Sequence, residues 1–184
     1  YVCDIGDVKQ VNDTVAQVLS ELGRIDVLIN NAGIIRVGML EDMALESIDD
    51  QLQINLAGTI YMTKACAPAL RETAGSIINI SSGLASKPVP AHAVYTATKG
   101  AVEAFSRAMA LELHDSGVRV NVIAPSLVRS DIYVADGMDQ ADYDQLHDAL
   151  GKQYLMGRSG EPEDVAELAA FLVSDKASWM TGTV

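Results

Sequence analysis

The sequence predicts an α/β fold in which a parallel sheet carries helices on both faces. Strand-like apolar runs alternate with segments of helical periodicity along the chain, and this alternation is typical of parallel sheets. The runs are nearly continuous in apolar residues, as in strands that are buried on both faces. Polar residues gather where the runs end. Because ligands of such sheets bind beyond the carboxyl ends of the strands, we expect a site at that edge.

The first half of the chain reads as strand, helix, strand, helix, strand. "YVCDI" has the pattern of a short strand, and Asp13 to Leu22 has helical spacing that Gly23 ends. "IDVLINNAG" is predicted to be a buried strand that runs into a loop. Ser47 to Arg71 is predicted to be a long helix, followed by the strand "SIINISS". Asn55 lies inside that helix, where Asn lowers helix stability, so we expect a local kink or a bound water there.

The second half continues the alternation. Ala93 to Leu113 is predicted to be a second long helix, and "VRVNVIAPS" is the next strand. Ser130 to Leu155 is acidic and predicted to be helical. "EPEDVAELAAFLVSD" follows as a helix with Pro162 near its first turn. "TGTV" has the pattern of the start of another strand.

Composition excludes several classes of protein. The chain has 184 residues and a formal net charge of −12, so a nucleic-acid partner is not expected. No apolar run approaches the length of a membrane span, and the opening "YVCDIGD" has no basic region of a signal peptide. Cys3 and Cys66 form no CxxC pair, which favours reduced thiols in a cytoplasmic protein. The spacing of the three histidines suggests no metal site.

The stretch "YTATKG" contains the residues with the clearest chemical potential. Tyr95 and Lys99 are four residues apart in a predicted helix, so they share one helix face. A nearby ammonium favours the phenolate and lowers the pKa of a phenol, and such a phenol can exchange protons in catalysis. A surface Tyr beside an exposed Lys is the alternative, because YxxxK often arises by chance.

Other strand ends add hydroxyl and amide groups to this pair. Ser82 ends the strand "SIINISS" and could hydrogen-bond the substrate oxygen that Tyr95 protonates; capping of a turn is the alternative. "NNAG", residues 30–33, ends another strand, and a simple turn would also explain its Asn and Gly. A solvent-facing side chain is the alternative for Asn55.

The order and spacing of these motifs resemble the classical branch of the short-chain dehydrogenase/reductase family. The resemblance extends over essentially all 184 residues. The matching stretches are "CDIGD", "IDVLINNAG", "QINLAG", "GSIINISS", "YTATKGAVEAFSRAMALEL", "VRVNVIAPS" and "GEPEDVAELAAFLVSDKASWMTG". It implies a single Rossmann-like domain over residues 1–184, incomplete at both ends.

The resemblance also implies an activity, which is interconversion of a secondary alcohol and a ketone with NAD or NADP. Tyr95 would be the general acid/base, Ser82 would hold and polarise the substrate carbonyl, and Lys99 would lower the phenol pKa and bind the ribose. Asn55 would hold a water for proton relay. Residues implied to contact the cofactor are Asp4, Ile5, Asn31, Ala32, Gly33, Tyr95, Lys99, Val128 and Ser130.

The sequence departs from the family pattern at three places. Ser126 stands where Gly usually follows Pro125, and Ser130 stands where Thr is usual. The chain also begins at what would be the third strand of the family, and it lacks a glycine-rich turn, so roughly 60 residues of two strand–helix units are not found. We therefore expect this chain to be an internal piece of a longer protein. We expect the longer protein to be the oxidoreductase and this piece alone to be inactive. Without the strands that would lie beside it, the first strand has no neighbour, so we expect the 184-residue chain to aggregate or to place residues 1–7 differently.

The sequence is compatible with more than one substrate, assembly and function class. The segment after Pro125 carries Tyr133 and Tyr143 among other apolar residues, and these would either line the substrate pocket or pack within the lid. The two long helices resemble a family dimer interface, which implies a homodimer or homotetramer; packing on the sheet is the alternative. An enoyl-type reductase is disfavoured by YxxxK with Ser82. A non-catalytic scaffold of the same fold is the other function class.

Overall fold

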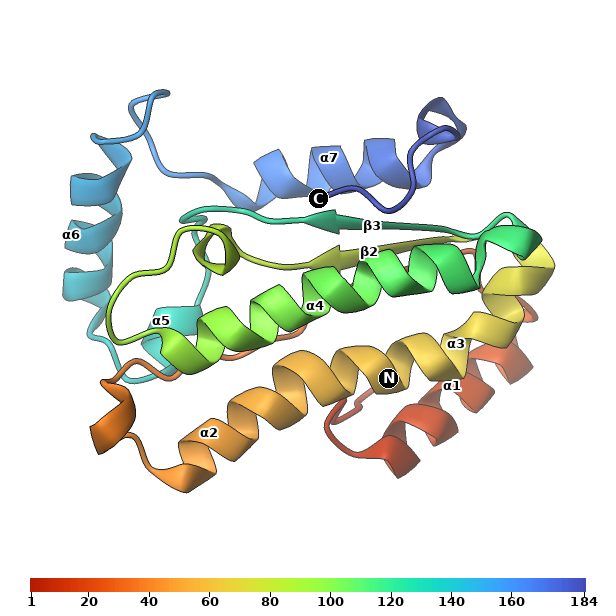
Figure 1. Ribbon diagram of the computed structural model, residues 1–184, viewed down its shortest axis with the longest axis horizontal. Helices are drawn as coiled ribbons and strands as arrows, with labels where there is room; N and C mark the ends of the chain where they lie inside the picture. The colour runs from red at the N-terminus through yellow and green to blue at the C-terminus, as the bar shows by residue number, and fades with distance from the viewer.

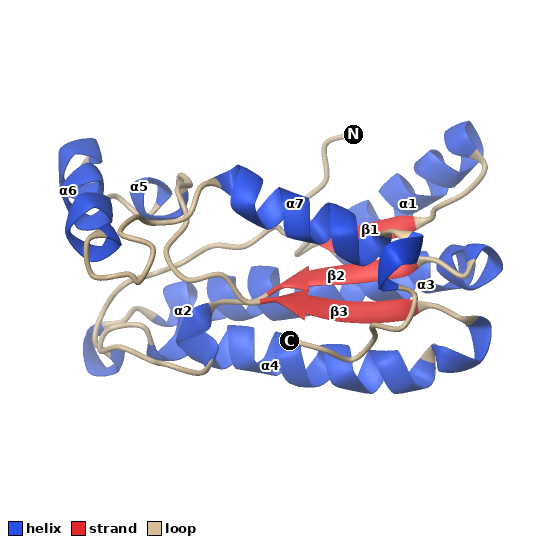
Figure 2. Cartoon of the chain, turned by 90° about the horizontal axis from the view of Figure 1, so that it is seen from above, coloured by secondary structure: helices blue, strands red, loops and turns tan.

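The computed structural model describes residues 1–184 and contains one parallel sheet. Its strands are β1 (Val27–Asn30), β2 (Ser76–Ile80) and β3 (Arg119–Ile123), in the order β1-β2-β3. Figure 2 shows the three strands side by side with β2 in the middle. In Figure 1, α1 to α4 lie on one side of the sheet and α7 lies on the other. The predicted α/β architecture is confirmed.

Most of the predicted helices form close to their expected bounds. α1 (Val8–Leu22) begins earlier than predicted because the Asp7 side chain caps it, and Gly23 ends it in the left-handed conformation with a φ of 79°. α4 (Ala93–Glu112) and α7 (Pro162–Val173) agree with the prediction. The remaining short 3-10 turns are Leu40–Asp42, Gly83–Ala85, His114–Ser116 and Asp175–Ala177.

The long helix expected over Ser47 to Arg71 is confirmed, and it contains the irregularity predicted at Asn55. α2 (Leu45–Gln51) continues into a π-helical segment, Leu52–Gly58, and then into α3 (Thr59–Thr73). π-helical turns inside α-helices are often found at functional sites. The segment holds Asn55 in a buried position beside the sheet.

Two apolar clusters fix the helices on the sheet. The larger one joins α1, α3 and α4 to the strands and includes Val15, Cys66, Leu70, Ile77 and Leu113. The smaller one joins α7 to Ile78 and Ile123. Both cysteines are free, and burial raises the pKa of the Cys66 thiol to about 11. Cys66 is therefore a packing residue of the larger cluster.

A pair of amide side chains, of which Asn79 is fully buried, aligns β1 with β2. Asn30 and Asn79 are register partners, and the Asn30 amide donates to the Asn79 side-chain oxygen at 2.7 Å. The Asn79 amide in turn donates to the Ser106 hydroxyl of α4 at 2.7 Å. The pair thus connects two strands and a helix beneath the edge where the polar residues lie.

The prediction of a strand at "YVCDI" is wrong. Strand backbone groups need hydrogen-bonding partners on a neighbouring strand, and here local side chains provide them instead. The backbone N–H of Asp4 donates to Gln10 at 3.1 Å, and that of Gly6 donates to the Asp4 carboxylate at 2.9 Å. Residues 1–7 lie outside the sheet. On the adjoining edge strand, Ile29 is 46% exposed.

The lid and the C-terminal segment follow their predictions in part. The lid contains α5 (Ile132–Ala135) and α6 (Gln140–Gly151), which Gly137 separates with a φ of 102°. "TGTV" forms no regular strand, yet Gly182 donates to Val120 O at 2.7 Å and Val122 donates to Thr183 O at 2.9 Å. The C-terminal segment therefore runs beside β3 with two backbone hydrogen bonds, but it forms no continuous strand ladder. None of the helices combines the length and the apolar composition needed to cross a bilayer.

Candidate active site

The site lies at the end of β2, where the first two turns of α4 are close to the residues that follow the strand. Beyond β2, the backbone N–H of Ser81 still donates to Ile123 O at 2.8 Å, so the strand end stays fixed against β3. Ser82 follows and is buried. Its hydroxyl accepts a hydrogen bond from the backbone N–H of Leu84 at 3.2 Å, so the capping alternative is also realised.

Tyr95 and Lys99 lie one turn apart on the face of α4 that packs on the sheet. Their exposed fractions are 8% and 5%, which excludes the alternative of a surface pair. Lys99 Nζ lies 5.6 Å from the centroid of the Tyr95 ring. It donates a hydrogen bond to Ile80 O at 2.9 Å, so the ammonium reaches the end of β2.

The pKa values of these two groups are set mainly by burial. Burial raises the pKa of Tyr95 to about 12, and an interaction with the Ser82 side chain opposes this shift. Burial lowers the pKa of Lys99 to about 8. The expected lowering of the phenol pKa by Lys99 is not found in this structure, where desolvation of the phenolate dominates and raises that pKa. At neutral pH the phenol is therefore protonated.

Asn55 joins this group through the loop that follows β1. Its side-chain oxygen accepts from the backbone N–H of Ile34 at 2.8 Å, and its amide donates to Ile34 O at 2.9 Å and to Thr98 Oγ1 at 3.2 Å. The alternative of a solvent-facing Asn is excluded. A β-carbon on Gly33 would lie 3.3 Å from Asn55 Oδ1 and 3.4 Å from Lys99 Nζ. Gly33 therefore allows both groups to approach the same backbone.

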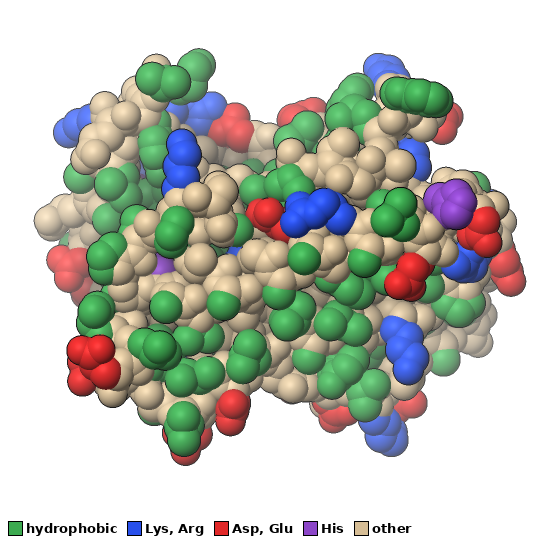
Figure 3. Space-filling view, viewed as in Figure 1, with side chains coloured by type: hydrophobic (Ala, Val, Ile, Leu, Met, Phe, Trp, Pro, Cys, Tyr) green, Lys and Arg blue, Asp and Glu red, His purple; other side chains and the backbone are tan.

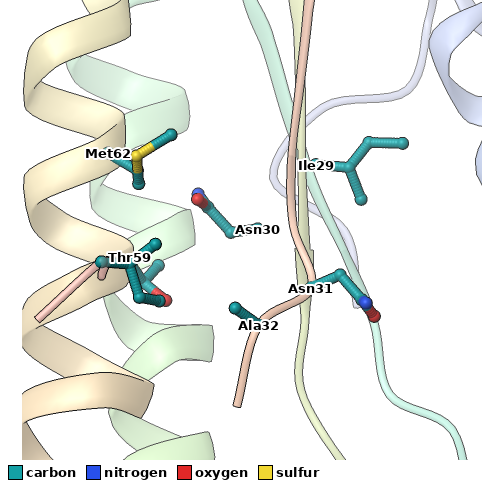
Figure 4. Close-up of a pocket in the computed structure, with 7 residues that line it drawn as sticks. Ile29, Asn30, Asn31, Ala32, Thr59 and Met62 are labelled. Atoms are coloured by element: carbon teal, nitrogen blue, oxygen red, sulfur yellow. The ribbon is translucent and has the colours of Figure 1, made fainter. Parts of the chain in front are cut away.

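The residues implied to contact a cofactor fall into two groups. Ile5, Asn31 and Ala32 line one shallow pocket of about 70 Å³ together with Ile29, Asn30, Thr59 and Met62. Figure 4 shows Asn30 pointing toward Thr59 and Met62, whereas Ile29 and Asn31 point away from them. Asp4 comes directly before Ile5 in the sequence, and its carboxylate accepts a hydrogen bond from the backbone N–H of Gly6. The structure thus brings the first group together from separate parts of the chain.

Val128 and Ser130 lie elsewhere along the same edge. Val128 lines a separate groove of about 380 Å³ between α7 and the segment after β3, and it forms an isolated bridge with Gly160. Ser130 is exposed, and its backbone N–H donates to the Tyr143 hydroxyl at 2.7 Å. No hydrogen bond joins either residue to Tyr95 or Lys99.

The lid residues divide between the two roles left open by the sequence. Figure 2 shows α5 and α6 beyond the end of the sheet toward which β2 and β3 point. Tyr133 of α5 lies near the site, since its ring centroid is 6.3 Å from that of His92 and its phenol contributes to the raised pKa of Tyr95. Tyr143 packs inside the lid against His147, with ring centroids 4.5 Å apart.

Two links at the site were not predicted from the sequence. Asp136 at the end of α5 accepts from the backbone N–H of Val37 at 2.9 Å and from Arg36 at 3.4 Å, so it ties the lid to the loop after β1. The Ser81 hydroxyl donates to Glu103 of α4 at 2.9 Å. Neither pair has a sequence signal, because each joins residues that only the tertiary fold brings together.

Known proteins match both the sequence and this geometry. A family model described as Enoyl-(Acyl carrier protein) reductase matches residues 1–184. The 3-oxoacyl-[acyl-carrier-protein] reductase FabG of Staphylococcus aureus is 37% identical over 180 residues, which are 97% of this chain and 71% of that protein. The chain belongs to the short-chain dehydrogenase/reductase family. Members of this family are oxidoreductases, so the chain is an enzyme that acts on a CH–OH group or the corresponding ketone.

Solved structures of this family share the fold. The NAD⁺-bound xylitol dehydrogenase structure has a TM-score of 0.88 and 29% identity and is covered to 75% by the whole of this chain. The ligand-free aldohexose dehydrogenase of Thermoplasma acidophilum has a TM-score of 0.92 and 31% identity, with 74% of that chain covered. The family and the NAD⁺-bound structure support a nicotinamide cofactor for this oxidoreductase.

Proposed function

We propose that the protein interconverts a secondary alcohol and a ketone with NAD or NADP, and that Tyr95 is the general acid/base. The observation that carries this proposal is the convergence of Ser82, Tyr95 and Lys99 beyond the end of β2. A phenol, a hydroxyl and an ammonium meet there in a buried setting. In such a setting, electrostatic effects on a reacting oxygen are stronger than in water.

The residues have separable chemical roles. Tyr95 is neutral at physiological pH, so it can donate its proton to a ketone oxygen as that oxygen becomes an alcohol. The Ser82 hydroxyl donates a hydrogen bond to the same oxygen and orients it. For the reverse reaction Tyr95 has to accept the proton, and the Lys99 ammonium stabilises the phenolate that exists before that step.

The chain offers suitable groups for a nicotinamide dinucleotide. Lys99 has three N–H donors, and Ile80 O is the one acceptor within hydrogen-bond distance. Ribose hydroxyls would satisfy the other two donors, and Gly33 leaves room beside them. The bound cofactor would supply or accept the hydride. The other residues proposed to hold it are Asp4, Ile5, Asn31, Ala32, Val128 and Ser130, and Asn55 is proposed to hold a relay water.

The substrate class is a neutral secondary alcohol or ketone, such as a sugar, a polyol, a steroid or a fatty ketone. The net charge of −12 disfavours a strongly anionic substrate. The relatives are named for 3-oxoacyl thioester, xylitol and aldohexose chemistry, and these three substrate types form the first test panel. A 2-enoyl thioester belongs in it as well, because the family model carries an enoyl reductase description.

The proposal is tested with the full-length protein and the variant Tyr95→Phe. We expect oxidation or reduction of at least one panel member with NAD(H) or NADP(H), measured by nicotinamide absorbance. Tyr95→Phe should lower kcat by about 10²–10⁴-fold, since it removes the proton donor, while cofactor affinity stays close to wild type. Retained turnover would refute the role of Tyr95. Activity on the enoyl thioester alone, or cofactor binding without any turnover, would favour the enoyl reductase or scaffold alternatives.

We also propose that the outer faces of α3 and α4 form a homodimer interface, within a dimer or tetramer. Figure 3 shows apolar side chains gathered over this side of the molecule. On the outer face of α4, Ala104, Ala108 and Leu111 are exposed, and Leu111 is 74% exposed. The opposite side of α4 packs on the sheet through Val102 and other residues. Light scattering should give a dimer or tetramer, and Ala108→Glu should yield monomers; a monomeric wild type would refute the proposal.

A further inference from the structure

A carboxylate outside the four predicted catalytic residues is tied to the end of β2. Glu103 lies one turn after Lys99 in α4, and its side chain is 16% exposed. Its Oε1 accepts a hydrogen bond from the Ser81 hydroxyl at 2.9 Å. Ser81 directly precedes Ser82, and it is also buried. The contact therefore joins the two elements that carry the site.

The hydroxyl of Ser81 has two acceptors within reach but a single proton. Its oxygen lies 2.9 Å from Glu103 Oε1 and 3.1 Å from Lys99 O. A carboxylate is the stronger acceptor because the hydrogen bond is charge-assisted, and a helical carbonyl already accepts a bond within its helix. Glu103 is therefore the preferred partner, and it directs the Ser81 side chain toward α4.

A second link between the same elements uses a residue that the proposed chemistry needs. Lys99 Nζ donates to Ile80 O at 2.9 Å. In the proposed reaction the other two N–H groups of this ammonium bind the ribose and its charge stabilises the phenolate, so Lys99 has roles besides holding the strand end. Glu103 has only the holding role, because its carboxylate accepts from Ser81 and has no part in the proposed reaction.

We propose that Glu103, acting through Ser81, is a positioning residue that fixes Ser82 relative to Tyr95. The inference rests on the proposed function, in which Ser82 and Tyr95 bind one substrate oxygen. A small displacement of one hydroxyl from that oxygen lowers the rate strongly. The second carboxylate oxygen of Glu103 lies 4.0 Å from Arg107, which is half exposed. That pair is weak and screened by solvent, so Arg107 provides a matched control.

The test compares Glu103→Ala, Glu103→Gln, Ser81→Ala and Arg107→Ala in the full-length protein. Glu103→Ala and Ser81→Ala should each lower kcat about ten- to a hundredfold with KM for the cofactor within about twofold, and the double variant should be no worse than either. Glu103→Gln keeps an acceptor oxygen and should restore kcat to within about threefold. Arg107→Ala should leave kcat unchanged. Wild-type kcat in Glu103→Ala, or losses that multiply in the double variant, would overturn the inference.

A second measurement separates this inference from the proposed function. Crystal structures of the wild type and Glu103→Ala should show Ser82 Oγ displaced from the Tyr95 hydroxyl by an amount resolvable between the two. An unchanged separation would overturn the positioning role whatever the activity. A wild type that converts no substrate would refute the proposed function alone. Should Glu103→Ala fail to fold, Ser81→Ala carries both measurements, and Glu103→Gln remains the variant expected to behave like the wild type.

Discussion

Replacing Lys99 with methionine should make the protein more stable at pH 7. The Lys99 side chain is buried, since the residue is only 5% exposed. Its ammonium donates a hydrogen bond to Ile80 O. A charge in this setting is less favourable than in the unfolded chain, where water surrounds it. Methionine has a similar length and carries no charge, so Lys99→Met removes the cost of burying the ammonium.

The magnitude follows from the pKa of Lys99. That value is lowered from 10.5 to about 8, and one pKa unit corresponds to about 1.4 kcal/mol, so the charged side chain lowers the free energy of unfolding by about 3 kcal/mol at pH 7. Lys99→Met also leaves Ile80 O without its donor, which costs about 1–2 kcal/mol. The expected net gain is about 1–2 kcal/mol.

The pH dependence gives the sign an independent check. Between pH 8 and pH 10.5 the unfolded chain binds more protons at Lys99 than the folded chain does, so wild-type stability rises with pH in that window. The advantage of Lys99→Met should therefore shrink from pH 7 to pH 9.5. Tyr95 acts in the opposite sense at higher pH, because its raised pKa of about 12 means that stability is lost as pH rises above 10.

Urea denaturation at pH 7 and pH 9.5 measures this effect as the free energy of unfolding. Lys64→Met is the matched control, because Lys64 is an exposed lysine of the neighbouring helix α3, and it should change stability by less than about 0.5 kcal/mol at either pH. A Lys99→Met protein that is less stable than wild type at pH 7, with a difference independent of pH, would refute the reasoning. Under the proposed function the same variant should also lose turnover.

Three further variants test the fold around the site. In Gly75→Ala the new β-carbon would collide with the backbone carbonyl oxygen of Asp26, so thermal denaturation should show a loss of at least about 2 kcal/mol. Asn55→Leu removes two hydrogen bonds to the backbone of Ile34. The free energy of unfolding measured in urea should therefore fall by about 2–4 kcal/mol, and hydrogen exchange at the Ile34 amide should be faster. Hydrogen bonds with Gln10 and Lys9 hold the pKa of Asp7 below its usual value, so Asp7→Ala should lower the urea midpoint at pH 7. Its difference from wild type should begin to shrink as pH falls below about 4 and be lost once pH passes below the lowered pKa of the folded protein. Wild-type stability in any of these three variants would contradict the corresponding contact.

Much of the fold could be predicted because it depends on local patterns. The strands β1 to β3 are continuous apolar runs, and α4 has unbroken helical spacing, so both were identified at nearly their observed bounds. The placement of Tyr95 and Lys99 on one face follows from their spacing alone. The irregularity at Asn55 was predicted because its side chain competes with the helix backbone, although its π-helical form was not.

The remaining features depend on contacts that no local pattern records. "YVCDI" has strand-like residues, but a strand also requires a neighbour, and side-chain bonds at Asp4 took its place. The pKa of Tyr95 was expected to fall because the spacing places a cation nearby, whereas its burial depends on how α4 and the lid pack. The bond between Ser81 and Glu103 requires both the register of β2 and its distance from α4.

The amide pair of Asn30 and Asn79 bears on how errors in strand register would affect this protein. In a sheet, a shift of one residue turns every side chain to the opposite face. The pair penalises such a shift because it would leave the buried Asn79 amide and the partly buried Asn30 amide without these partners. Without it, a chain could fold with apolar strands in the wrong alignment, and the loops after β1 and β2 would no longer be aligned with each other. Replacing these amides would then give a compact, folded protein in which the residues of the proposed active site are no longer aligned.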